Sequence, residues 1–226
     1  MKIARKLTLF LSTMFLTGMV YTSTVLGSPF IEEMPKLTVS ADDPNLREWT
    51  KPGVNPSDYN SLMIVQPIIF LSEKNKYKGM QPDQMKYFAD KVAMIFISKM
   101  GSAIEITTTP GPGVLIMNMA ITELKMKKKR GILSFTPIGA VAHAATSQTE
   151  YEDMNKMAEK INMTDANLEI EFLDGASGER VAIRVLTVEG KQKDREEKSW
   201  YALGAEIEEL ADRFAANYSV SMADKR

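Results

Sequence analysis

Apolar positions recur every three or four residues in two stretches of the chain, which predicts two amphipathic helices. The first stretch runs from Pro82 to Met100. Pro82 and Asp83 suit the first turn of a helix, and Gly101 suits the position after its last turn. The second stretch covers residues 200–218 and carries its acidic side chains and Arg213 mostly on the solvated side, opposite the apolar face. Each helix therefore has one apolar face to bury against a sheet.

The rest of the apolar pattern predicts about five strands. They are alternating or nearly continuous apolar runs bounded by polar residues: 62–71, 103–109, 114–125, 168–172 and 181–185. Pro67 cannot donate to a sheet ladder, so it indicates an edge or a bulge in the first of them. Alternation along the run 114–125 puts one set of apolar residues on one face: Leu115, Met117, Met119 and Ile121. The last two strands form a hairpin around a turn at 174–179, and the apolar face of the returning strand is predicted to be Val181, Ile183 and Val185. Glu169 and Glu171 alternate with the apolar positions of the first hairpin strand, which places them on its solvated face.

This order of elements predicts an α+β fold, a two-layer sandwich in which two main helices pack on a mixed, largely antiparallel sheet. We assign residues 61–220 to a single domain of this kind and residues 221–226 to a C-terminal tail. Residues 28–60 are rich in proline and show no sustained period, which predicts an extended arm or tether. Trp49 and Tyr59 would pin the end of this arm to the domain.

The start of the chain has the pattern of a secretory signal peptide, which we assign to residues 1–27. Three basic residues, Lys2, Arg5 and Lys6, precede a charge-free, largely apolar run. Cleavage is predicted between Gly27 and Ser28, after small residues. A retained membrane anchor is the alternative, although the serine, threonine and glycine residues of this run dilute its apolar character. We therefore expect an exported protein that is periplasmic or secreted.

Composition narrows the chemistry that the chain can perform. The sequence contains no cysteine, which excludes disulfides, thiol nucleophiles, thiolate metal sites and a lipidated cysteine. Loss of the three basic residues with the signal peptide changes the net charge from −1 to about −4. This balance suits a soluble protein and argues against a nucleic-acid partner.

Neither a catalytic constellation nor a metal or cofactor motif is apparent. His143 is the single histidine and lies in an alanine-rich segment without a nearby acid, which disfavours a catalytic triad and an imidazole metal site. The turn at 110–113 lacks the lysine and the helix of a phosphate loop. Carboxylate pairs such as Glu208 and Glu209 project from predicted solvated faces, where burial would not raise a pKa for acid catalysis. We expect a protein that is not an enzyme and needs no cofactor.

A basic cluster followed by an uncharged stretch is the candidate interaction surface. The stretch 131–149 has no formal charge apart from His143. The candidate residues are either basic or small and apolar: Lys127, Lys128, Lys129, Arg130, Ile138, Ala140 and Ala144. Three interpretations remain open, namely packing over the sheet, contact with a second copy or a partner protein, and weak contact with anionic lipid at a membrane surface.

Several short motifs, taken in order, are similar to a known family. The motifs are the strand after Tyr59, Gly111-Pro112-Gly113-Val114-Leu115, Ala120-Ile121-Thr122, Asp174 with Ser177-Gly178-Glu179, and the late helix from Trp200. Over about residues 45–220 they resemble the bacterial domain-of-unknown-function family numbered 3313. Many of its members look like outer-membrane lipoproteins with a lipobox cysteine. The resemblance implies an envelope location and no catalytic residues, and the missing cysteine favours a soluble form.

Two functions follow as hypotheses. The first is a non-enzymatic periplasmic module that docks an envelope partner or self-associates through the 131–149 stretch and a sheet edge. The second is a carrier of a small ligand or lipid, with an apolar pocket between helix and sheet lined by Met85, Phe88, Met117 and Met119.

Overall fold

The computed structural model describes residues 27–74, 82–128, 161–189 and 200–223. Its elements in chain order are β1 (Thr38–Val39), β2 (Leu46–Thr50), the short 3₁₀ helix η1 (Pro56–Asp58), β3 (Ser61–Ile64), β4 (Ile68–Leu71), α1 (Pro82–Met100), β5 (Glu105–Thr107), β6 (Val114–Lys128), β7 (Ile161–Asp174), β8 (Arg180–Glu189) and α3 (Trp200–Ala223). The α+β prediction is confirmed. The predicted bounds of the first helix, Pro82 to Met100, match α1 at both ends.

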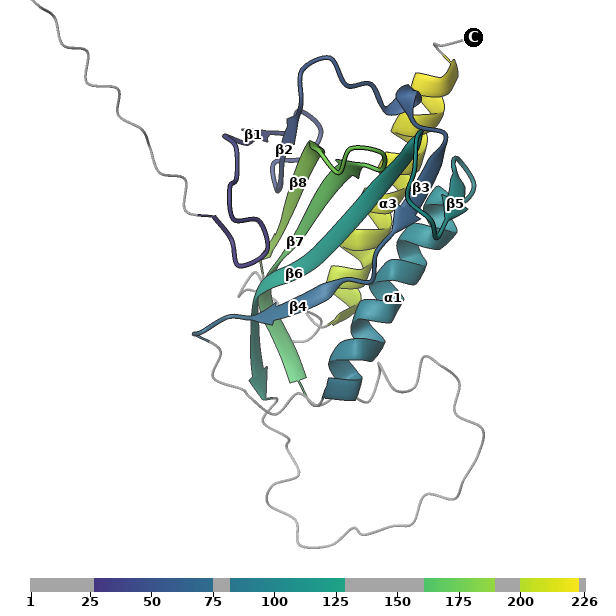
Figure 1. Cartoon of the computed structure of the whole chain (residues 1–226). Helices are drawn as coiled ribbons and strands as arrows, with labels where there is room; N and C mark the ends of the chain where they lie inside the picture. Colours follow the sequence, from purple (N-terminus) through teal and green to yellow (C-terminus); the bar gives the residue numbers. More distant parts are fainter. Residues whose placement is uncertain (1–26, 75–81, 129–160, 190–199, 224–226) are drawn as a thin grey trace, which may run out of the picture.

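One mixed sheet forms the first layer (Figure 1). Its strand order is β1-β2-β8-β7-β6-β3-β5, and β4 pairs with β6 beyond β3. The strands β3 and β4 run parallel to β6 one after the other and are separated by residues 65–67. Pro67 lies in this interruption, as a residue without a backbone N–H should. The sheet thus has eight strands where the sequence predicted about five.

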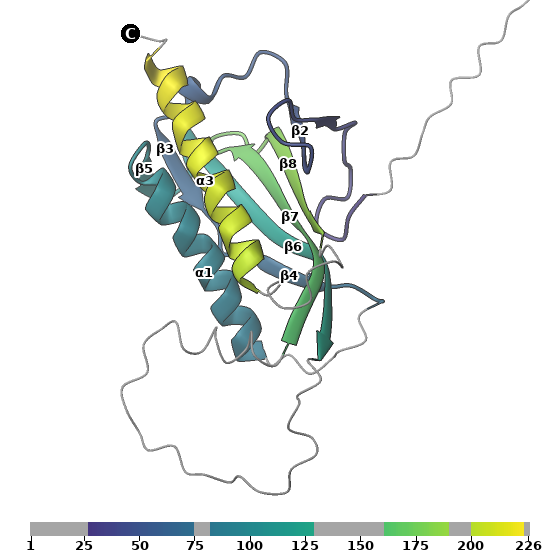
Figure 2. The ribbon, with the colours of Figure 1, turned by 180° about the vertical axis from the view of Figure 1, so that it is seen from behind.

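Both helices cover the same face of the sheet and lie side by side (Figure 2). The rings of Phe96 on α1 and Phe172 on β7 each pack against Phe214 on α3, with centroid distances of 6.2 and 5.8 Å. The Lys99 ammonium also bonds the Asp212 carboxylate between the helices at 2.9 Å. The alternation of β6 puts Met117, Met119 and Ile121 under the helices, as predicted, and the main core lies there. Neither helix in the described ranges is both long and apolar enough to cross a bilayer.

The hairpin of β7 and β8 forms around the predicted turn. Asp174 accepts hydrogen bonds from the backbone N–H groups of Ala176 and Ser177 and from the Ser177 hydroxyl. Gly178 has a φ of +71°, a conformation that costs an L side chain energy. The register between β7 and β8 shows that the predicted inward face of β8 is wrong for Ile183 and Val185. Phe172 lies opposite Ala182, so the even-numbered residues from Ala182 to Val188 face the helices while Ile183 and Val185 face away.

The N-terminal arm is more structured than a tether. It contributes β1 and β2, and β2 pairs with β8 over its whole length. Before these strands, Ile31 packs against Ile183 and Val185 on the face of the sheet that the helices leave open. Trp49 joins this second cluster, and Tyr59 is buried in the main core, so both aromatic residues hold the arm to the domain as predicted.

Candidate functional site

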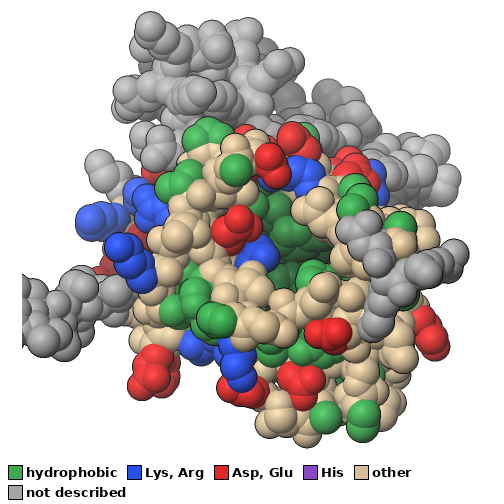
Figure 3. All heavy atoms as spheres, turned by 90° about the horizontal axis from the view of Figure 1, so that it is seen from above, with side chains coloured by type: hydrophobic (Ala, Val, Ile, Leu, Met, Phe, Trp, Pro, Cys, Tyr) green, Lys and Arg blue, Asp and Glu red, His purple; other side chains and the backbone are tan. Residues whose placement is uncertain are grey.

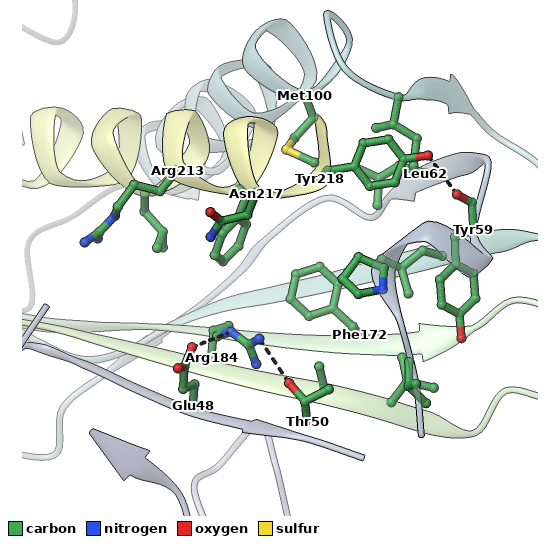
Figure 4. A pocket seen from close by; sticks show the side chains of 18 of the residues that line it. Glu48, Thr50, Tyr59, Leu62, Met100, Phe172, Arg184, Arg213, Asn217 and Tyr218 are labelled. Carbon is green, nitrogen blue, oxygen red and sulfur yellow. Dashed lines mark hydrogen bonds and ion pairs between the residues drawn. The ribbon is translucent and has the colours of Figure 1, made fainter. Parts of the chain in front are cut away.

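A cavity of about 230 Å3 lies between α3 and the sheet, toward the C-terminal ends of both helices (Figure 4). From above, the space-filling view shows a hollow with apolar side chains on its floor and charged side chains at its rim (Figure 3). The apolar residues that line the cavity include Leu62, Met100, Ile104, Leu115, Phe172 and Phe214. The polar residues that line it are Ser40, Asp42, Glu48, Thr50, Arg184, Arg213 and Asn217. The cavity is therefore amphipathic.

The arginine of β8 supplies one charged group of this cavity. Arg184 takes one of the positions of β8 that face the helices, where most side chains are apolar. Its Nε lies 3.2 Å from the Glu48 carboxylate, and its terminal nitrogens donate to the backbone oxygens of Trp49 and Ile183 and to the Thr50 hydroxyl. Burial lowers the pKa of Arg184 below its ordinary value, and the charge of Glu48 offsets only part of this effect. An arginine still stays protonated at neutral pH.

A second arginine enters from the helix. Arg213 extends from α3 toward the sheet layer, and its terminal nitrogen donates to the Asp43 carboxylate of the arm at 2.7 Å. Burial raises the pKa of Asp43, but the hydrogen bonds from Arg213 and from the backbone of Asn45 and Leu46 outweigh it and hold the pKa below its ordinary value. The Nε–H of Arg213 is buried and has no acceptor in the described structure. This donor is the one unsatisfied buried side-chain atom found there.

Two tyrosines close the other end of the cavity. The Tyr218 hydroxyl donates to the backbone oxygen of Tyr59 at 2.7 Å, which ties α3 to the segment after η1. Burial raises the pKa of Tyr218 above its ordinary value, so the phenol remains a donor at neutral pH. The cavity thus has a closed apolar end beside the tyrosines and a polar end beside the arginines.

The sequence predicted a pocket between helix and sheet, but with other residues. Phe88, Met117 and Met119 are almost fully buried in the main core, and Met85 packs against it. None of these four residues lines the cavity. They lie where α1 packs closely on the sheet, whereas the cavity lies beneath α3 toward β2 and β8.

The predicted interaction surface falls mostly outside the described residues. Lys127 and Lys128 end β6, and only their backbone is described. The remaining candidates share a place beyond that strand, outside the described part: Lys129, Arg130, Ile138, Ala140 and Ala144. His143 lies outside it too. The structure therefore leaves this surface as a prediction.

Sequence reasoning missed both arginines. Arg213 was assigned to the solvated side of its helix, because neighbouring acids surround it in sequence. The alternation through Ile183 and Val185 predicted the wrong inner face for the strand, one that would turn Arg184 outward. The run Ala182, Arg184, Leu186 was the available signal, yet only the pairing of β8 with β7 decides which face points inward.

The prediction that Glu169 lies on a solvated face is also wrong. The predicted solvated carboxylate is 3% exposed, because the arm covers it. It accepts hydrogen bonds from the hydroxyls of Thr122 and Ser28. Because each carboxylate oxygen accepts from a hydroxyl of the fold itself, the cluster has a structural role. Within the described ranges no three His, Cys, Asp or Glu side chains gather as a metal site would need.

Comparison with known proteins places the chain in a family. Residues 27–218 match the family described as protein of unknown function, DUF3313. The chain belongs to this family. The resemblance drawn from the motifs is thereby confirmed, and it extends further toward the N-terminus than those motifs did. No curated protein is significantly similar in sequence to this DUF3313 protein.

Three solved structures are distantly similar to this chain. A PelC dodecamer from Paraburkholderia phytofirmans aligns with a TM-score of 0.39 and 11% identity over 74% of this chain and 96% of its own. Protein XCC0632 from Xanthomonas campestris, of family DUF330, gives 0.39 and 10% over 76% and 92%. The DUF4136 protein BT2437 from Bacteroides thetaiotaomicron gives 0.38 and 12% over 78% and 98%. At these values the likeness carries no information about what the DUF3313 protein binds.

Proposed function

We propose that this protein is an exported, non-enzymatic module of the cell envelope that binds a small amphipathic molecule in the cavity between α3 and the sheet. The observation that carries the proposal is the cavity itself, in which an apolar floor meets two buried or half-buried guanidinium groups. Ligand sites in proteins combine a largely apolar lining with a few fixed polar groups in this way.

The size of the cavity limits its occupant. At about 230 Å3 it is smaller than the ~300–1,000 Å3 of sites for drug-sized ligands. A short alkyl chain or a single ring fits this volume better than a complete lipid with two acyl chains. The proposal is therefore the ligand-carrier hypothesis in a narrower form, with a different set of lining residues.

The state of the acids supports a binding role over catalysis. Glu48 is tied to Arg184, and Asp43 is tied to Arg213. A general acid needs a carboxyl group that is protonated near neutral pH, which burial without a cationic partner produces. The Asp43 pKa is lowered instead. These carboxylates position the arginines, and the arginines offer donors to a ligand.

The location and the partner-docking role remain part of the proposal. Export rests on the signal pattern of residues 1–27 and on cleavage before Ser28. Docking of an envelope protein or of a second copy through the 131–149 stretch stays a prediction, as does contact of the basic cluster with a membrane surface. None of the three is needed for the cavity to bind a ligand.

Native mass spectrometry of the protein exported by its own signal sequence tests the proposal. We expect a mature mass that begins at Ser28, together with a retained or exchangeable small molecule. Asn217→Trp would block the rim of the cavity, because Asn217 is exposed on α3 and lines it. Ala216→Trp is the matched control, since Ala216 is exposed on the same turn but does not line the cavity.

Ligand retention is compared between these two variants. Loss of the bound molecule in Asn217→Trp and its retention in Ala216→Trp would support the proposal. A protein that neither retains nor takes up any short-chain amphiphile would contradict it, and so would a ligand that Asn217→Trp leaves in place.

A further inference from the structure

We propose that cleavage before Ser28 creates an ion pair, in which the new α-ammonium group of Ser28 becomes the cationic partner of the buried Glu169 carboxylate. The inference rests on the cleavage site that is part of the proposed function, and it goes beyond ligand binding. It gives the processing step a structural consequence, because the arm is then held to the sheet more strongly in the mature protein than in the precursor.

Glu169 is a buried acid without a cationic partner. Its side chain is 3% exposed, and in the described structure its carboxylate accepts from the hydroxyls of Ser28 and Thr122 and forms no ion pair. By contrast, three half-buried acids each have an arginine: Glu48 with Arg184, Glu171 with Arg180 and Asp43 with Arg213. A buried charge is costly unless it is paired as well as hydrogen-bonded, so a cation beside Glu169 would stabilise the folded state.

The backbone nitrogen of Ser28 lies close to this carboxylate. The nitrogen and the hydroxyl of Ser28 are joined through two carbon atoms, so the nitrogen lies within about 6 Å of the Glu169 oxygen that the hydroxyl bonds. Opposite charges influence one another strongly over this range. As a peptide N–H, the nitrogen has one hydrogen, which it donates to the Ile31 backbone oxygen at 3.0 Å. An α-ammonium group has three, so it can keep this bond and direct another toward Glu169.

The turn at the start of the arm indicates that cleavage precedes docking. The Ser28 hydroxyl accepts from the backbone N–H groups of Phe30 and Ile31, which closes a turn directly after the predicted cleavage site. A Cβ atom on Gly27 would lie 2.1 Å from the Glu32 backbone oxygen, so the chain before Ser28 is packed against this turn. A protease reaches a bond held in this way only when the segment opens locally. The arm therefore docks with its ammonium group already free.

The ion pair acts at a distance from the cavity. The arm continues from Ser28 to β2, and Leu46, Glu48 and Thr50 of β2 line the cavity. Of the described residues, none before Ser40 lines it. A change confined to the start of the arm therefore tests the ion pair without touching the site proposed for the ligand.

Thermal unfolding of two forms of the protein provides the test. The mature form begins at Ser28. The extended form begins with two added glycines before Gly27, which moves the ammonium group three residues away from Ser28. Both forms carry the same charges, and the added residues have no side chains. Glu169→Gln is made in each form as the control, because glutamine removes the negative charge and keeps the size of the side chain.

We expect the mature form to melt about 3–6 °C above the extended form at pH 6, where an α-amino group is charged. The difference should disappear in Glu169→Gln, since a neutral amide does not pair with the ammonium group. A second measurement needs no variant. Acetylation of the α-amine, followed by mass spectrometry, should be about tenfold slower at Ser28 of the mature form than at the first glycine of the extended form.

Several results would overturn the inference. Equal melting temperatures of the two forms would do so, and so would a difference that persists in Glu169→Gln. If Glu169→Gln fails to fold, the acetylation rates decide, and equal rates at the two α-amines contradict the ion pair. A mature mass that begins at another residue removes the ammonium group from this place and overturns it as well. Ligand retention is measured separately at the cavity, so the ion pair and ligand binding can each fail alone.

Discussion

The hydroxyl of Ser28 donates a hydrogen bond to the carboxylate of Glu169, which joins the beginning of the arm to a central strand across 141 residues of sequence. The same hydroxyl accepts from the backbone N–H groups of Phe30 and Ile31, so the arm turns sharply there and inserts Ile31 against the sheet. Thr122 donates to the other oxygen of Glu169. One buried carboxylate thus fixes how the arm covers the second face of the sheet.

Glu169→Gln should destabilise the fold by about 1–2 kcal/mol, because an amide has one acceptor oxygen where the carboxylate has two. One of the two hydroxyls then loses its partner in a buried place. Urea denaturation measures the free energy of unfolding. Glu105→Gln is the control, since Glu105 is exposed on the short strand β5 and should change stability by less than about 0.5 kcal/mol. Equal stability of the two variants would contradict the role given to Glu169.

Arg184→Lys should destabilise the protein by about 1–3 kcal/mol, although it preserves the charge. Lysine cannot reproduce the guanidinium fork that bonds Glu48, Thr50 and two backbone oxygens at once. The same urea experiment measures the loss. The exposed Arg47→Lys should leave the midpoint of unfolding unchanged. A midpoint for Arg184→Lys within error of the wild type would show that the network adds little to stability.

The Asp43–Arg213 ion pair should make the stability of the fold depend on pH below about pH 4. The pKa of Asp43 in the folded protein lies below its ordinary value of 3.8, so the folded state binds this proton less tightly than the unfolded chain does. The stabilisation is therefore fully present above about pH 4 and is lost as the pH falls through the folded-state pKa. Melting temperatures measure it. The gap between wild type and Asp43→Asn should be wide at pH 6 and narrow toward pH 3, whereas a gap of constant size would refute the linkage.

Tyr218→Phe should cost about 0.5–1.5 kcal/mol, because the backbone oxygen of Tyr59 loses its buried donor. The ring still fills its place, so the fold itself should be retained. Hydrogen exchange should show faster opening of the segment around Tyr59 and unchanged protection in β6 and β7. Unchanged exchange at both places would mean that the tyrosine does not hold the closed end of the cavity.

Local sequence signals predicted correctly those elements whose conformation depends on residues close by in the chain. Pro82, Asp83 and Gly101 bound α1 correctly, because helix ends depend on nearby backbone groups. The turn at Asp174 was likewise recognised from residues that act within a few positions. Pro67 indicated an edge or a bulge, whereas in the structure it lies where the predicted strand divides into β3 and β4. The inward face of β6 followed from simple alternation.

The sequence was insufficient where partners distant in the chain decide the outcome. Glu169 is buried only because the arm folds over it, and its own neighbours indicate exposure. The strand β2 forms by pairing with β8, and the residue pattern of the arm has no periodicity that would predict this pairing. Arg184 faces inward because of the register between β7 and β8. The lining of the cavity depends on the last two relationships, so a pocket between helix and sheet could be anticipated but not its lining.

Methionine methyl NMR during titration with octanoate tests the central claim most directly. Met100 lines the cavity, whereas Met117 and Met119 are buried in the main core, where the sequence alone placed a pocket. Met94 is exposed on α1 and reports nonspecific binding. We expect a saturable shift of the Met100 methyl resonance while the other three stay unchanged. Binding that shifts Met117 and Met119 and leaves Met100 in place would contradict it.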